Sequence, residues 1–425
     1  MQSTILLCTV GGSHQPVITA IHRLQPQHVV FFCTDNDPAT GKAGSRSQVE
    51  GKGSCISEVN GAAPTLPNIP AQCDLPQSGY TTLVVPADDI DGAFDVMRRA
   101  IADARFKYPQ ALCVADYTGG TKSMTAALVL AALDDGHVEL QFVTGARADL
   151  VKVRDGTQAT ASAAVEGIHL RQCMAPALAA WSRYAYDEAH AALEQIEAPR
   201  QPRLHAVWQR ARDLCAGLAA WDRFDHQGAL KRLGDYEAIV ARDLGPAYAA
   251  LRWMATGKDE RDEARRLWDL WLNAQRRAAA GRYDDAVARA YRLLEWTAQW
   301  LLRTEKGWNT EDLPTEVASA TGITANREGK YQAGLIAAWG IVATRCGSAA
   351  ATFWDAERGA MLDHVKRRNH SILAHGFMPI AGADWNVFST WLEHRFVPFL
   401  SDTFAGLKVQ RFQQLPDSYP WGETS

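Results

Sequence analysis

An arginine and a histidine near the carboxyl end of the sequence are spaced for joint chemistry. Arg368 and His375 lie in a segment that starts Lys366-Arg367-Arg368-Asn369-His370 and runs on to Gly376. In a helix, seven residues return to within roughly 20° of the starting direction, so the spacing predicts both side chains on one face. We expect Gly376 to end this helix and His375 to lie in its last turn, where the helix dipole favours a protonated imidazole. A cation beside an imidazole, which exchanges protons near neutral pH, could catalyse proton transfer.

This spacing alone is weakly specific, because other arginine and histidine pairs in the chain match it: Arg23 and His28, Arg183 and His190, Arg200 and His205, and Arg358 and His364. The pair Arg368 and His375 differs from these four in its neighbouring residues. Asn369 follows the arginine, Ala374 and Gly376 flank the histidine, and a helical stretch at 281–295 precedes them. The alternative interpretation is a helix end covered with solvated charges.

Two glycine-rich loops are candidates for binding phosphate. They are Thr9-Val10-Gly11-Gly12-Ser13 and Asp116-Tyr117-Thr118-Gly119-Gly120-Thr121-Lys122-Ser123, and each lies between an expected strand and an expected helix. Paired glycines free backbone N–H groups to face an anion, the following helix N-terminus adds partial positive charge, and Lys122 adds a full one. Neither loop fits the P-loop or the dinucleotide fingerprint. The alternative is that both glycine pairs only relieve tight turns.

The elements that position these loops alternate between strand and helix over the first 155 residues. Expected strands are Ile5–Thr9, His28–Cys33, Thr81–Val85, Ala111–Ala115 and Val138–Val143, and expected helices are Pro16–Leu24, Ile90–Tyr108 and Lys122–Asp134. This alternation predicts a Rossmann-like domain with a mainly parallel sheet. The segment Asp35–Gly79 interrupts it as a mobile loop or an embellishment.

From about Ala175 onward, helical spacing replaces the strands. A phrase recurs there, as Trp181-Ser182-Arg183-Tyr184, Trp221-Asp222-Arg223-Phe224 and Gly281-Arg282-Tyr283, which resembles the turn between paired helices. The fold class is therefore α/β plus all-α, with domains expected at 1–160, 161–265 (a helical linker) and 266–425. Six tryptophans of the last domain are interpreted as core residues: Trp296, Trp300, Trp308, Trp354, Trp385 and Trp391.

Composition bounds the possible functions. The 425 residues carry a net charge of −4, which excludes a general coat for nucleic acid and requires any such contact to be local. The N-terminus lacks the features of a signal peptide and no apolar run is long enough to span a membrane, so we expect a cytoplasmic protein. The 8 cysteines form no CxxC pair, and we expect no metal site.

The two loops resemble the motifs of the CARF domain of CRISPR-associated effectors over about residues 1–155. The resemblance implies a cyclic oligoadenylate ligand, with four or six adenylates, bound across the two-fold axis of a homodimer. Carried over by position, the ligand-binding residues are Gly11, Gly12, Ser13, Thr118, Gly119, Gly120, Thr121 and Lys122.

The basic motif and the upstream helix resemble a HEPN ribonuclease domain over roughly Leu267–Leu400. The resemblance places the catalytic signature on Arg368 and His375, with Asn369 orienting the phosphate or capping the motif. The RNA 2′-hydroxyl then acts as nucleophile without a metal and leaves a 2′,3′-cyclic phosphate. Lys366, Arg367 and His370 are expected to hold RNA by charge, and Arg292 and Glu295 to form a network around the site.

Together, the two resemblances identify a type III CRISPR-associated CARF–HEPN effector. They imply an allosteric endoribonuclease for single-stranded RNA in antiviral defence, with cyclic oligoadenylate as activator rather than cofactor. The alternative is a non-catalytic sensing or partner-binding module whose helical domain mediates dimerisation. A third possibility is that the CARF domain also degrades its activator.

Overall fold

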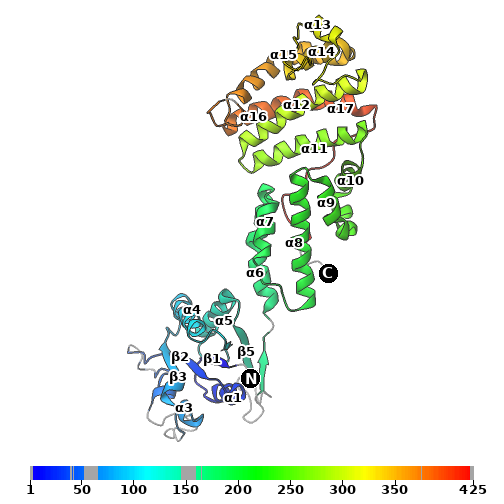
Figure 1. Ribbon diagram of the computed structural model, residues 1–425. Coiled ribbons are helices and arrows are strands. Elements are labelled where there is room, and N and C mark those ends of the chain that lie inside the picture. Colours follow the sequence, from blue (N-terminus) through cyan, green and yellow to red (C-terminus); the bar gives the residue numbers. More distant parts are fainter. Residues whose placement is uncertain are drawn as a thin grey trace. The chain divides into compact units, whose positions relative to one another are not determined.

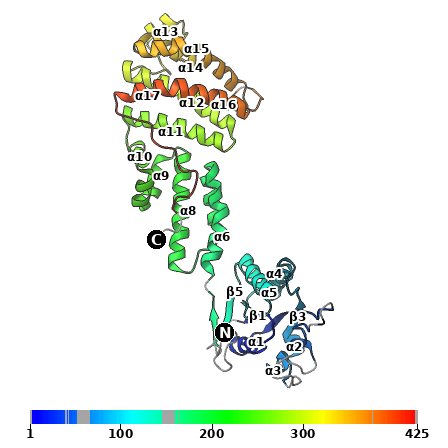
Figure 2. The same ribbon diagram turned by 180° about the vertical axis from the view of Figure 1, so that it is seen from behind.

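The computed structural model describes residues 3–38, 41, 43–51, 66–144, 159–163, 165–374 and 376–421. The chain divides into two compact units, Met1–Gln172 and Cys173–Ser425, which are considered separately (Figures 1 and 2). The predicted linker domain, 161–265, lies mainly in the second unit, and its independence from the nuclease domain stays a prediction.

The first unit contains a six-stranded sheet of order β3-β2-β1-β4-β5-β6. Its strands are β1 Thr4–Thr9, β2 His28–Cys33, β3 Tyr80–Val84, β4 Leu112–Asp116, β5 Glu139–Thr144 and β6 Ala159–Ser162. The strands β1 to β5 run parallel, and β6 pairs antiparallel with β5. The Rossmann-like sheet with mainly parallel strands is therefore confirmed, and β6 is an addition to the predicted strands.

Helices cover both faces of this sheet (Figure 1). The helices α4 Ile90–Lys107 and α5 Lys122–Asp135 form a core with one face, through side chains such as Met97 and Leu128. On the other face, α1 Gln15–Leu24 packs with Val49 and Ile69, which lie on the short helices α2 Ser47–Glu50 and α3 Ile69–Gln72. The described part of the segment 35–79, which ends in the turn η1 Gln77–Gly79, is therefore an embellishment that adds to the core.

The described residues of the second unit form helices joined by turns and loops, with no strand among them. Its elements are α6 Glu166–Ala179 (which begins in the first unit), η2 Ala180–Arg183, α7 Tyr186–Glu194, α8 Pro202–Asp222, α9 His226–Leu233, η3 Gly234–Tyr236, α10 Glu237–Thr256, α11 Glu260–Ala279, α12 Tyr283–Lys306, α13 Thr315–Thr321, α14 Leu335–Arg345, α15 Gly347–Asn369, α16 Gly382–Trp391, η4 Leu392–Phe396 and α17 Val397–Ala405. Trp268, Trp271 and Trp339 are fully buried in its core. Among the described helices, none combines the length and the apolar character needed to cross a membrane.

The phrase that recurs in the sequence forms the same turn three times. Tyr184, Phe224 and Gly281 all have a positive φ, of 54°, 65° and 73°. In each case this residue donates its N–H to the carbonyl three residues back, and the next residue donates to the carbonyl five residues back. An alanine five residues further on (Ala189, Ala229 and Ala286) is fully buried. The recurring phrase is therefore a repeated helix-turn-helix unit.

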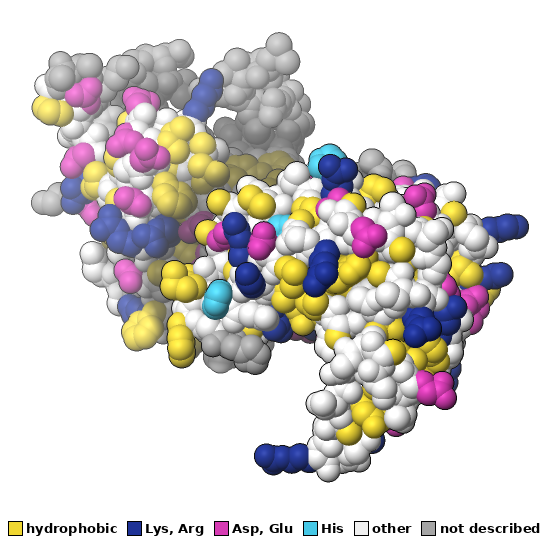
Figure 3. All heavy atoms as spheres, turned by 90° about the horizontal axis from the view of Figure 1, so that it is seen from above, with side chains coloured by type: hydrophobic (Ala, Val, Ile, Leu, Met, Phe, Trp, Pro, Cys, Tyr) yellow, Lys and Arg dark blue, Asp and Glu magenta, His cyan; other side chains and the backbone are white. Residues whose placement is uncertain are grey.

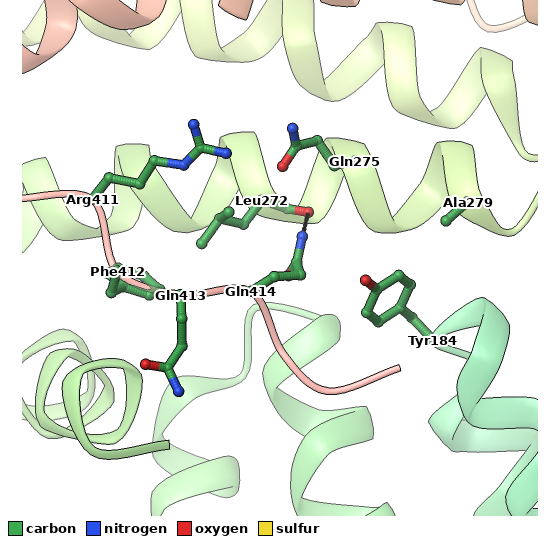
Figure 4. A pocket seen from close by; sticks show the side chains of 8 residues that line it. All are labelled: Tyr184, Leu272, Gln275, Ala279, Arg411, Phe412, Gln413 and Gln414. Carbon is green, nitrogen blue, oxygen red and sulfur yellow. Dashed lines mark hydrogen bonds between the residues drawn. The ribbon is translucent and has the colours of Figure 1, made fainter. Parts of the chain in front are cut away.

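Residues 409–421, here called the C-terminal strap, follow α17 and return to the helices α7, α10 and α11. Figure 4 shows Gln414 against α11, where its amide donates to the Leu272 carbonyl at 2.9 Å. Further along, the Pro416 carbonyl accepts from the Tyr186 hydroxyl at 2.6 Å, and the Trp421 indole donates to Asp243 at 2.7 Å. The strap encloses a cavity of about 380 Å³ with Tyr184 and α11. It therefore joins parts of the second unit that are far apart in sequence.

Candidate functional site

The two glycine-rich loops lie side by side at the carboxyl edge of the sheet. The strands β1 and β4 are neighbours, with Cys8 paired to Asp116, and each loop begins where its strand ends. The strand order reverses between β1 and β4, because the chain adds β2 and β3 on one side and β5 on the other. In open α/β sheets, ligands bind in the crevice at such a reversal. The fold therefore brings both predicted loops to one candidate site.

Packing between the loops explains some of the glycines but not all. A Cβ on Gly11 would lie 2.5 Å from the Gly120 nitrogen, a Cβ on Gly119 would meet the Thr9 carbonyl oxygen, and Gly120 has a φ of +85°. In contrast, a Cβ on Gly12 would have no neighbour within 4 Å. Gly11, Gly119 and Gly120 are therefore required by the backbone, whereas Gly12 leaves open space at an exposed position.

A hydrogen-bond network fixes the loop that follows β4. The buried carboxylate of Asp116 accepts from the Thr118 N–H at 3.0 Å and from the Gln141 amide at 3.2 Å. The Thr118 hydroxyl accepts from the Val143 N–H at 2.7 Å, and the Thr9 hydroxyl donates to the Gly119 carbonyl at 2.7 Å. Burial raises the pKa of Asp116, although the hydrogen bonds with Thr118 and Gln141 lower it in part. The loop is therefore held in one conformation before any ligand arrives.

Positive charge is available at the start of α5. The Thr121 hydroxyl caps this helix by accepting from the Met124 N–H at 3.2 Å, and it also donates to the Ala87 carbonyl. Lys122, the first residue of α5, is exposed, as are Gly12 and Ser13 in the neighbouring loop. A helix N-terminus with an adjacent lysine favours an anionic ligand such as a phosphate.

The basic motif of the second unit departs from the predicted helix. The helix α15 ends at Asn369, so the expectation that it continues to Gly376 and presents positions 368 and 375 on one helical face is wrong. The His370 and Ser371 N–H groups bond to carbonyls of the last turn, and the Met378 N–H then donates to the His370 carbonyl at 3.3 Å. A Cβ on Gly376 would overlap this carbonyl oxygen. Gly376 is therefore required where the chain folds back, not as a helix stop. His375 itself lies outside the described residues.

Arg368 is oriented by aromatic and polar contacts at the end of α15. Its guanidinium lies over the Tyr291 ring of α12, 4.3 Å from the centroid, and its Nη1 donates to Asn369 Oδ1 at 3.2 Å. Its buried Nε has no partner among the described residues. Burial, together with the nearby Glu295, raises the pKa of Tyr291. Tyr291 belongs to the upstream helix that made the motif distinctive, but sequence spacing alone gives no sign that it contacts Arg368.

Ion pairs hold Arg367 of the motif and Arg292 of the upstream helix, whereas Lys366 and His370 are exposed. Arg367 pairs with Asp384 at 2.7 Å, and Arg292 pairs with Glu295 at 2.6 Å, which places the expected network on α12. Figure 3 shows Lys and Arg side chains interspersed with Asp and Glu on the face that it presents. Contacts to a polyanion would therefore be local on this face.

The turn after Arg368 exposes large apolar side chains that sequence reasoning did not single out. Ile372, Leu373, Phe377 and Met378 are 55%, 50%, 93% and 69% exposed. Such a cluster beside a candidate site indicates an interaction surface. Within the residues that the structure describes, no group of three or more His, Cys, Asp or Glu side chains could hold a metal ion.

Comparison with known proteins was made on sequence and on structure. Residues 256–396 match the family model described as the Csm6 HEPN domain. The structure resembles Enterococcus italicus Csm6 bound to cyclic hexa-2′-fluoro-hexa-dAMP, with a TM-score of 0.60 and 10% identity over 96% of this chain and 95% of that chain. It also matches Can2 from Sulfobacillus thermosulfidooxidans in complex with cyclic tetra-adenylate, with a TM-score of 0.25 and 12% identity over 49% of this chain and 57% of that chain. A search of curated proteins found no match.

The fold and the matched segment point to one class of protein. A Rossmann-like domain precedes an all-α domain in this chain, and the chain shares the fold of the Enterococcus protein. Together with the similarity of residues 256–396 to the Csm6 HEPN domain, this fold supports the resemblance to CARF–HEPN effectors that was inferred from the sequence. The predicted fold class, α/β plus all-α, is confirmed.

Proposed function

We propose that this protein is a homodimeric, metal-independent endoribonuclease that cleaves single-stranded RNA in the cytoplasm when cyclic oligoadenylate binds its N-terminal domain. The observation that carries the proposal is the placement of Arg368 on Tyr291 at the end of α15, within the segment that matches a Csm6 HEPN domain. Type III CRISPR antiviral defence is the setting that this architecture supports.

The chemistry assigns one role to each residue of the motif. His375 exchanges the protons of the 2′-hydroxyl nucleophile and the 5′-oxygen leaving group, and Arg368 stabilises the negative charge that develops on the phosphate. The 2′-oxygen attacks phosphorus as the bond to the 5′-oxygen breaks, which leaves a 2′,3′-cyclic phosphate. Asn369 Oδ1 holds Arg368 in place. One copy supplies a single imidazole, so two copies across a two-fold axis complete the donor and acceptor set.

The ligand is proposed to lie over Gly12, Ser13 and Lys122 at the carboxyl edge of the sheet. A ring of phosphates and adenines has internal symmetry, so the same loops of two copies can hold it from both sides. The hydrogen bonds of Thr118 prearrange this loop, so the N–H groups of Gly119, Gly120 and Thr121 would meet phosphates without reorganisation. The ring of six adenylates is tested first, because the Enterococcus protein of the same fold is described with an analogue of that ring.

Activation requires that the ligand bind the nuclease-competent dimer more tightly than the resting one. The helices at 161–265 are proposed to couple the two domains. If the first domain binds the ligand and the second cleaves RNA, Lys122→Ala raises the ligand concentration needed for activation. Arg368→Ala and His375→Ala, in contrast, abolish cleavage and retain ligand binding. Loss of ligand affinity in His375→Ala would contradict this division of roles.

The test is a cleavage assay with a fluorescent single-stranded RNA in EDTA, with cyclic tri-, tetra- and hexa-adenylate added separately. We expect cleavage with one ring only, and none in His375→Ala. Absence of cleavage with every ring, in protein shown to be folded and dimeric, would favour the non-catalytic sensing module instead.

A further inference from the structure

A polar pocket lies on α12 beside the helical turn that carries Tyr291. Its volume is about 770 Å³, within the range of about 300–1,000 Å³ usual for ligand sites. One wall is formed by α12, and the other by the connection between α12 and α14. Its lining side chains include Arg292, Glu295, Gln299, Arg303, Trp308 and Gln332.

The wall formed by α12 begins next to Tyr291, the residue that the candidate catalytic Arg368 contacts. Arg292, Glu295, Gln299 and Arg303 are spaced by three or four residues, so they form one stripe along the helix. Tyr291, on which Arg368 stacks, immediately precedes this stripe. With a rise of about 1.5 Å per residue, the stripe extends about 18 Å from Tyr291. Because this length exceeds the spacing of adjacent nucleotides, a strand whose scissile phosphate lies at Arg368 would place a nucleotide several positions further along in the pocket.

The charges of the pocket do not suit a phosphate. Arg292 is bonded to Glu295 at 2.6 Å and to Gln299 at 2.9 Å, and Arg303 pairs with Glu263. The lining arginines are thus matched by the lining carboxylates of Glu295 and Glu311. A phosphate site would present unpaired positive charge. A neutral mixture of donors and acceptors instead resembles what the edge of a nucleobase requires.

An aromatic ring and free amide groups complete such a site. Of the six tryptophans interpreted as core residues, Trp300, Trp354 and Trp385 are buried, whereas Trp296, Trp308 and Trp391 are only partly buried. Trp308 lines the pocket. The Gln299 Oε1 accepts from Arg292, which leaves its Nε2 without a partner among the described residues. Aromatic faces and amide groups together bind unpaired bases by stacking and by hydrogen bonds to base edges.

The second wall is ordered rather than loose. The Trp308 N–H donates to the Leu302 carbonyl at 3.1 Å, the Ala333 N–H donates to the Thr310 carbonyl at 2.9 Å, and the Leu313 N–H donates to the Tyr331 carbonyl at 2.9 Å. Thr310 is buried beneath this wall. The pocket therefore keeps its shape without a ligand, which lowers the entropic cost of binding.

We propose that this pocket binds one base of the single-stranded RNA, several nucleotides from the scissile phosphate, and sets the sequence preference of cleavage. The inference rests on the proposed ribonuclease function, because it assumes RNA at Arg368. Trp308 supplies the stacking face, and Glu295, Gln299 and Gln332 bond the base edge.

Binding is measured without cleavage, so that the pocket is tested apart from the nuclease. Full-length protein carrying His375→Ala is titrated, with its activator present, into fluorescent oligoadenylate, oligoguanylate, oligocytidylate and oligouridylate of equal length. Trp308→Ala and Gln332→Ala are added to this background. We expect Trp308→Ala to weaken the preferred oligomer about tenfold, the usual effect of losing one stacked base. Gln332→Ala, a substitution at the surface, is expected to make the affinities for the four oligomers more alike.

Matched controls are Trp253→Ala and Gln227→Ala, which remove an exposed tryptophan and an exposed glutamine on α10 and α9. Both are expected to bind all four oligomers as the parent does. Unchanged affinities and an unchanged order of preference in both pocket variants would overturn the assignment. A failure of the proposed function would show in the separate cleavage assay, where the wild-type protein would cleave no RNA with any activator.

Discussion

Adjacent glycines in the first loop serve different purposes. Gly11 packs against the backbone of Gly120, so its missing side chain is a requirement of the fold. Gly12 has no neighbour within 4 Å among the described residues, so no contact there demands its small size. A glycine at such an open position allows close approach of the proposed ligand to the backbone.

This difference yields a prediction about two single substitutions. Gly11→Ala is expected to lower the free energy of unfolding by about 1–3 kcal/mol, because its Cβ overlaps fixed backbone. Gly12→Ala is expected to leave thermal unfolding unchanged and to weaken cyclic oligoadenylate binding about tenfold, or about 1.4 kcal/mol. The measurements are thermal melts and binding isotherms. Unchanged ligand affinity in Gly12→Ala would remove Gly12 from the site.

For single residues, the sequence indicated which side chains belong to the candidate sites better than it indicated the contacts that those side chains make. Both loops and Arg368 could be singled out as candidates because glycine pairs, and a cation near a histidine, indicate chemistry in the local sequence. The contact between Arg368 and Tyr291 could not, because it joins residues of two helices through tertiary packing. The end of α15 was also misplaced, since pairing of the chain with His370 competes with continuation of the helix.

Among the elements, the repeated turn shows how one backbone shape tolerates different residues. Tyr184 and Phe224 adopt the left-handed conformation despite their side chains, whereas Gly281 does so without a steric cost. The three sites differ in residue type but share their hydrogen bonds.

We therefore expect Gly281→Ala to destabilise the protein by about 1 kcal/mol, because φ is +73° and its Cβ would meet no other atom. The matched control is Gly234→Ala, where φ is −60° and the space is equally open. There, alanine is expected to be neutral or to stabilise by about 0.5 kcal/mol. Chemical denaturation curves compare the two variants, and equal effects would contradict the assignment.

The helix α15 carries a buried imidazole one turn before Arg368. His364 stacks on Phe388 at 4.4 Å, and burial, with a smaller effect of Arg367, lowers its pKa to about 4. Its Nδ1 has no partner among the described residues. The folded protein therefore holds this imidazole neutral at a pH where the unfolded chain protonates it.

Stability is consequently expected to fall as the pH decreases from about 6.5 towards 4, by at most about 3 kcal/mol from this group. His364→Phe keeps the stacking and removes the titration, so its free energy of unfolding should exceed that of the wild type at about pH 5 and match it near pH 7.5. Urea unfolding at both pH values measures this difference. The same pH slope in both proteins would refute the role of His364.

The strands were the elements most readily predicted, because β1 and β2 are continuous apolar runs buried on both faces. The strand β6 was missed since Ala159–Ser162 has only small residues and lies at the sheet edge. The alternation of strands and helices predicts a parallel sheet, but it does not predict the order of the strands. It therefore could not show that the loops after β1 and β4 lie side by side.

For the whole molecule, the apolar turn beside Arg368 is a candidate for the contact surface of the proposed dimer. Its side chains flank the candidate catalytic arginine, where the proposed dimer must bring two sites together. Burial of four large apolar side chains would contribute favourably to association.

Phe377→Asp is accordingly expected to convert the dimer to a monomer or weaken it strongly, and to abolish RNA cleavage, with helical circular dichroism unchanged because this ring is 93% exposed. The matched control is Phe106→Asp at the end of α4, where the ring is 90% exposed. Analytical ultracentrifugation gives the mass of each variant. A dimer of unchanged affinity in Phe377→Asp would exclude this surface.

The C-terminal strap has a consequence for how the protein matures on the ribosome. The bond from Tyr186 to Pro416 joins residues separated by 230 positions. At synthesis rates of about 5–20 residues per second, the linker helices wait about 10–50 s for this partner to emerge. The sheet of the first unit, by contrast, is complete once residue 162 has been made. Each new chain can therefore complete the sheet of its first unit well before its second unit can close.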